Sequence, residues 1–141
     1  MTISSYAGDT FLWLGIGLFC AGTLLGFPHG LSKRNGDTAP TELWRIAHLS
    51  TCVGGVSLIA LTLALERLVG NVAIYALTPL SIAAYSFFLA CALSGWLNRS
   101  WDGDRTQRRV MLIYMLQIFA SIMSVVAVTG MLGGLIWKLM S

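Results

Sequence analysis

The sequence predicts an all-α integral membrane protein, a four-transmembrane-helix bundle that forms one domain over residues 1–141. Its composition is 56% hydrophobic and only 11% charged, with a mean hydropathy of +0.75, which is far from the balance of a soluble domain. The charged residues also leave four long uncharged stretches. Helices are expected in all four, because an isolated strand would leave backbone N–H and C=O groups unpaired in lipid.

Each uncharged stretch is long enough for one membrane crossing, which takes about 20 residues. The predicted spans are 10–27, 46–65, 73–97 and 110–137. Pro28 is expected to end the first span, and Pro79 predicts a kink inside the third. A cleaved signal peptide is the alternative for the first span, but residues 1–9 contain no Lys or Arg for its basic region.

The basic residues predict the orientation. Most of them lie between the first two spans or between the last two: Lys33, Arg34, Arg45, Arg99, Arg105, Arg108 and Arg109. Because cytoplasmic loops are enriched in Lys and Arg, both connections are predicted to be cytoplasmic and both termini outside, as in a bacterial inner membrane. Topology therefore accounts for the net charge of +3, and no nucleic-acid partner is expected.

The sequence has no Walker loop, GxSxG, HExxH or dinucleotide fingerprint. The absence of these motifs excludes the common soluble enzyme classes. Two pairs of glycines four residues apart, Gly22 with Gly26 and Gly130 with Gly134, predict close helix packing. That packing serves either the fold of one subunit or an oligomer face. A sizeable cofactor would fit better between subunits of so small a bundle, which favours a homo-oligomer.

His48 is the main candidate for a functional residue inside the membrane. It follows Arg45 by three residues, about 4.5 Å along a helix, and so lies just inside the cytoplasmic boundary. Imidazole at this depth can ligate a metal or haem iron, or carry protons, and Gly55 on the same face would admit a flat group. A purely structural histidine bonded to a carbonyl or a headgroup remains open, as does a second ligand from His29.

Tyr85, in the third span, is a candidate proton donor or substrate-orienting hydroxyl. A packing role with the hydroxyl bonded to a nearby carbonyl is the alternative. Arg45 and, from the other connection, Arg99 or Arg108 are candidates to pair with the carboxylates of a cofactor. The positive-inside pattern explains the same arginines without a cofactor.

Several parts of the sequence together resemble a known family. They are the glycine-containing runs 17–19 and 22–27, the Ala47-His48-Leu49 start of the second span, the Gly54-Gly55 pair and Tyr85. It is the group of small four-span membrane isomerases that includes hydroxylaminobenzene mutase and styrene oxide isomerase. The resemblance covers most of the chain in span order.

This resemblance implies a redox-neutral rearrangement of a small, lipophilic, usually aromatic epoxide or hydroxylamine within the membrane. It implies haem b held by His48 between the subunits of a trimer, with the iron as a Lewis acid and Tyr85 orienting the substrate. The family has an asparagine six residues after the histidine, where this chain has Gly54. Thr51 is the candidate to replace that amide.

Two other classes stay open from the sequence. A haem electron carrier or membrane-anchor subunit predicts two axial ligands, for which His29 and His48 are the two histidines of the chain. A non-catalytic small membrane protein that packs against a larger complex predicts no cofactor.

Overall fold

The computed structural model describes residues 3–98 and 106–140, so Arg99 and Arg105 lie outside the described residues. Within these ranges the chain is helical and has no strand, which confirms the all-α prediction. The elements in order are α1 (Ile3–Asn35), α2 (Thr38–Val69), the 3-10 helix η1 (Gly70–Ala73), α3 (Ile74–Leu97) and α4 (Arg108–Met140). Three continuous helical segments are long and apolar enough to cross a membrane: Gly8–Asn35, Thr38–Leu97 and Arg108–Met140.

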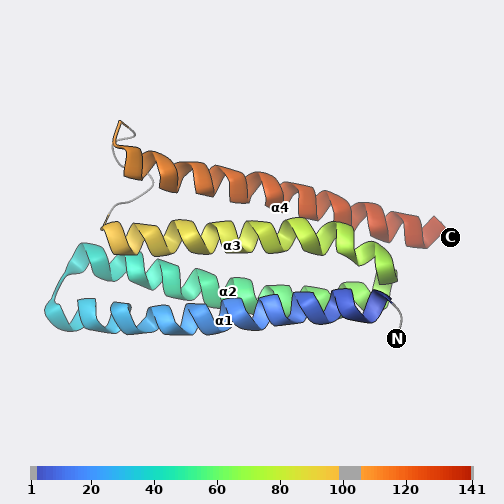
Figure 1. The fold of residues 1–141 in the computed structure, drawn as a ribbon, viewed down its shortest axis with the longest axis horizontal. Helices are drawn as coiled ribbons and strands as arrows, with labels where there is room; N and C mark the ends of the chain where they lie inside the picture. Colours follow the sequence, from blue (N-terminus) through green and yellow to red (C-terminus); the bar gives the residue numbers. More distant parts are fainter. Residues whose placement is uncertain (1–2, 99–105, 141) are drawn as a thin grey trace.

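The middle segment folds back on itself at η1, so that α2 and α3 lie side by side (Figure 1). Gly70 makes this reversal feasible with a φ of 58°, a backbone conformation that is costly for residues with a Cβ. Its N–H bonds to the carbonyl of Glu66 and closes the end of α2. The 3-10 turn then leads directly into α3, close to the start predicted at residue 73.

The expected end of the first helix at Pro28 is wrong, because α1 continues to Asn35 with Pro28 inside it. A proline removes one N–H donor from a helix but leaves the other hydrogen bonds in place. The polar turn is therefore very short: Gly36, with a φ of 77°, donates its N–H to the Lys33 carbonyl, and α2 begins at Thr38. His29 accordingly lies on α1.

The helices pack mainly in sequence order, α1 on α2, α2 on α3 and α3 on α4. No extensive contact joins α1 to α4 in the described residues, so the arrangement is open on that side and is not a closed bundle. Figure 1 places the α1–α2 turn, the end of α3 and the start of α4 at one end of the molecule. The helix ends that flank the two basic connections thus lie at the same end of the molecule, and the cytoplasmic location of that end stays a prediction.

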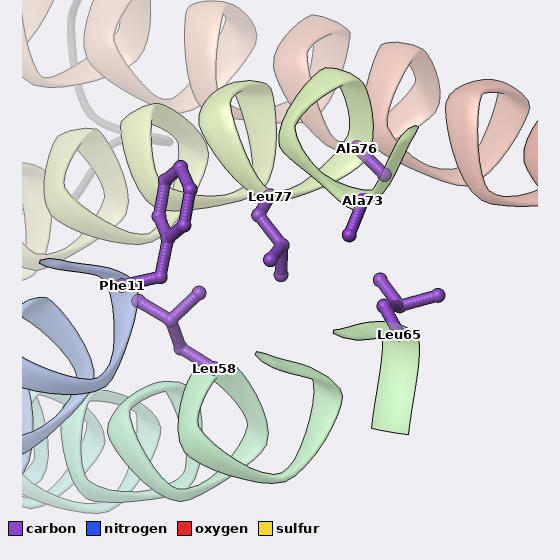
Figure 2. Packing of buried hydrophobic residues seen from close by; sticks show 6 residues of the cluster. All are labelled: Phe11, Leu58, Leu65, Ala73, Ala76 and Leu77. Carbon is purple, nitrogen blue, oxygen red and sulfur yellow. The ribbon is translucent and has the colours of Figure 1, made fainter. Parts of the chain in front are cut away.

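A cluster of buried apolar residues lies near η1, where α1, α2 and α3 meet (Figure 2). It consists of Phe11, Leu58, Leu65, Ala73, Ala76 and Leu77. Elsewhere the outward helix faces carry large apolar side chains, such as Leu24, which is 73% exposed, and Val125, which is 67% exposed. Continuous apolar faces of this kind suit contact with lipid and are unusual on a soluble monomer.

Candidate functional site

The candidate site begins with the close approach of α1 and α2, which glycines permit. A Cβ placed on Gly22 would lie 2.6 Å from the backbone nitrogen of Cys52. One placed on Gly55 would lie 2.5 Å from the backbone nitrogen of Phe19. Since both distances are far below van der Waals contact, these glycines bring the two backbones together within one chain.

His48 lies at this interface, half-buried, with its Nδ1 2.8 Å from the carbonyl oxygen of Gly22 on α1. A carbonyl only accepts hydrogen bonds, so Nδ1 carries the proton and donates it. In a neutral imidazole the Nε2 atom is then left with its lone pair, which is the form that binds a metal. The ring is thus oriented by α1 and keeps one nitrogen, Nε2, with a lone pair that can bind a metal.

The immediate surroundings of His48 are small. A Cβ on Gly26 would lie 3.3 Å from Cε1 of His48, so the missing side chain leaves room for the ring beside α1. The thiol sulfur of Cys52, one turn further along α2, lies 3.8 Å from Nδ1. The predicted glycine pair of α1 therefore serves the histidine directly: Gly22 supplies its acceptor, and Gly26 supplies its space.

His29 makes an equivalent bond, with its Nδ1 3.1 Å from the carbonyl oxygen of Thr41 on α2. Thr41 and His48 are seven residues apart on α2, about 10 Å along the helix axis. Two ligands of one metal ion lie at roughly 2 Å from it each, so the two imidazoles do not converge on one ion within this chain. Among the described residues no group of three or more His, Cys, Asp or Glu side chains is placed to hold a metal ion.

Arg45 and Gly55, which were expected to contact a cofactor, have other partners in the structure. Arg45 is exposed and is paired with Glu42, its Nε lying 2.8 Å from a carboxylate oxygen. A carboxylate of a cofactor would have to compete with Glu42 for it. The surface of Gly55 faces the backbone of α1, so the space above this glycine is filled by protein and is not open to a flat ligand.

Tyr85 donates its hydroxyl to the Leu14 carbonyl of α1 at 2.8 Å. Leu14 and Gly22 are eight residues apart on α1, about 12 Å along the axis, so the structure does not bring Tyr85 and His48 together within one chain. Thr51 is only 2% exposed, and its hydroxyl is a buried polar group with no hydrogen-bond partner in the described residues.

The Gly22 carbonyl is the functional group that the sequence did not reveal. It belongs to the backbone and is 26 residues away from His48, so only the packing of the two helices brings it to the imidazole. Comparisons with known protein families, with curated proteins and with solved structures found no match to this chain.

Proposed function

We propose that this protein crosses a bilayer four times, once with each of α1 to α4, and forms a membrane-embedded isomerase. Four crossings are supported by the reversal at η1, because α2 and α3 pack against each other instead of continuing as one rod. A helix of about 20 residues spans the hydrocarbon layer, and each of the four is longer than that.

The geometry of His48 is the observation that carries the proposed cofactor, haem b with His48 as its one ligand from this chain. The Nδ1–H bond to Gly22 sets the tautomer and leaves Nε2 as a donor, an arrangement typical of metal-ligating histidines. When bound, a haem with one protein ligand supplies a Lewis acid that polarises a substrate oxygen without net electron transfer.

The proposed reaction is the redox-neutral rearrangement of a small lipophilic aromatic epoxide or hydroxylamine, as in the family that the sequence resembles. In this proposal the chain contributes an oriented imidazole and apolar surroundings that keep water from a cationic intermediate. Tyr85 lies away from His48 of the same chain, so a substrate contact from Tyr85 requires a second copy in a homo-oligomer, such as the trimer implied by the resemblance. Thr51 is buried inside each copy, so no substrate contact is proposed for it.

Electron transfer through two histidine ligands is the competing function. The separation of about 10 Å between the His29 and His48 bonds along α2 argues against it within one chain. A bis-histidine site would need one ligand from each of two copies.

The absorption spectrum of the protein, purified in detergent after expression with added haem, tests these alternatives. We expect a Soret band in the wild type and in His29→Ala, the matched control, and none in His48→Ala unless imidazole is added. Conversion of a phenyl-substituted epoxide or of N-phenylhydroxylamine to its isomer should follow the Soret band across the variants. A Soret band that survives in His48→Ala contradicts the ligand assignment, and a low-spin spectrum lost in either variant supports electron transfer.

A further inference from the structure

A second feature lies on the other side of α2, where a partly open cavity of about 450 Å³ separates α2, α3 and α4. Small side chains create this space: Gly54 on α2, Ala83 and Ala84 on α3, and Ala120 on α4 all line it. Contact between α2 and α4 is sparse, which leaves space between these two helices.

The cavity does not belong to the His48 site. Ser57, which lines the cavity, follows His48 by nine residues on α2, and nine residues are 2.5 turns at 3.6 residues per turn. The two side chains therefore leave α2 on opposite faces. His48 meets α1, whereas Ser57 faces α3 and α4.

The cavity lining is apolar except for three hydroxyl groups. Leu58, Leu80 and Phe87 supply apolar surface, and Ser57, Ser121 and Ser124 supply the hydroxyls. The hydroxyls of Ser121 and Ser124 each donate to the carbonyl four residues earlier, at 2.9 Å. Their donors are thus used, whereas lone pairs on both oxygens remain able to accept.

We propose that this cavity binds a small, uncharged, lipophilic molecule that carries one hydrogen-bond donor, of the alcohol or phenol class. The volume falls in the range of small-molecule sites, and such sites combine a mainly apolar wall with a few polar groups. Among the described residues, no charged side chain lines the cavity to pair with an ion. A lipid acyl chain would leave the serine oxygens without a donor. This inference is independent of the proposed function at His48.

The test uses the full chain in deuterated detergent micelles and two probes of equal shape, p-cresol and p-xylene, which differ by a hydroxyl in place of a methyl group. Saturation-transfer NMR gives the dissociation constant of each probe. We expect p-cresol to bind roughly 2- to 10-fold more tightly than p-xylene, the usual range for one net hydrogen bond. Replacing both serines of α4, Ser121→Ala with Ser124→Ala, should remove this preference and leave p-xylene unchanged.

A cavity-filling variant controls for probe dissolved in the micelle. Ala84→Phe should weaken p-cresol binding at least about 10-fold, whereas Ala60→Phe, on an exposed part of α2 outside the cavity, should not. His48→Ala should bind p-cresol as the wild type does, which separates this site from the proposed isomerase. Equal binding of both probes, or unchanged binding in Ala84→Phe, overturns the proposal. So does an oligomer size that falls in Ala84→Phe, because a second copy would then occupy the cavity.

Discussion

Gly22→Ala is the substitution whose effect the structure determines most directly. The new Cβ would lie 2.6 Å from the Cys52 nitrogen, and ordinary contact begins near 3.4 Å, so α1 must move away from α2 by about 0.8 Å. A shift of that size along the hydrogen bond would stretch the 2.8 Å distance from His48 Nδ1 to the Gly22 oxygen to about 3.6 Å. At that length the hydrogen bond is lost.

The energetic cost has two parts. Overpacking costs about 1–3 kcal/mol, and the lost hydrogen bond adds roughly 0.5–1.5 kcal/mol. The higher helix propensity of alanine returns up to about 1 kcal/mol. We therefore expect the free energy of unfolding to fall by about 0.5–4.5 kcal/mol.

Reversible unfolding in mixed micelles measures the stability, and ¹⁵N NMR of labelled histidine measures the tautomer of His48. Gly133→Ala is the matched control, because a Cβ there meets nothing within 4 Å. The wild type should show a protonated Nδ1 at His48, and Gly22→Ala should lose that single-tautomer signal. If Gly22→Ala is as stable as Gly133→Ala and keeps the wild-type imidazole signals, α1 is not displaced from α2 and the predicted effect is refuted.

Three further substitutions test the other interhelical contacts by the same unfolding measurement. Tyr85→Phe removes the bond to the Leu14 carbonyl and should cost roughly 0.5–1.5 kcal/mol, because that carbonyl keeps its partner within the helix; no loss would mean that the bond is absent. Thr51→Val replaces an unpartnered buried hydroxyl with a methyl group and should stabilise the protein by about 1 kcal/mol, whereas a destabilised variant would show that the hydroxyl is bonded. Gly95→Ala would place a Cβ 2.7 Å from the ring of Trp44 and should cost about 1–3 kcal/mol, and a neutral result would place the ring elsewhere.

The ranges of the helices were predictable to different degrees. The range predicted for the third helix, 73–97, differs by one residue from that of α3, because Gly70 and Asn98, with positive φ, bound this stretch. The other three helices extend past their uncharged stretches, since a helix continues through charged residues as long as its backbone bonds are made. Pro28 was misjudged for the same reason: a proline is a local obstacle that the rest of the helix can accommodate.

The candidate site was predictable as a residue but not as an arrangement. A histidine inside an apolar stretch is conspicuous, and the sequence identified His48 on that basis. Which of its nitrogens is free depends on Gly22, and the partner of Tyr85 depends on Leu14, 71 residues away in the chain. Sequence spacing also placed Gly55 on the His48 face of α2, but not the backbone of Phe19 directly over it.

By itself, the sequence determined the all-α class and the apolar segments long enough to span a membrane. These properties depend on residues that are close together in the sequence, so the composition and the positions of the charged residues are enough to predict them. Only the tertiary structure decided the orientation of His48, the role of Gly55 and the cavity between α2, α3 and α4. These depend on how each helix is rotated against its neighbours, and that rotation follows from close packing between residues far apart in the chain.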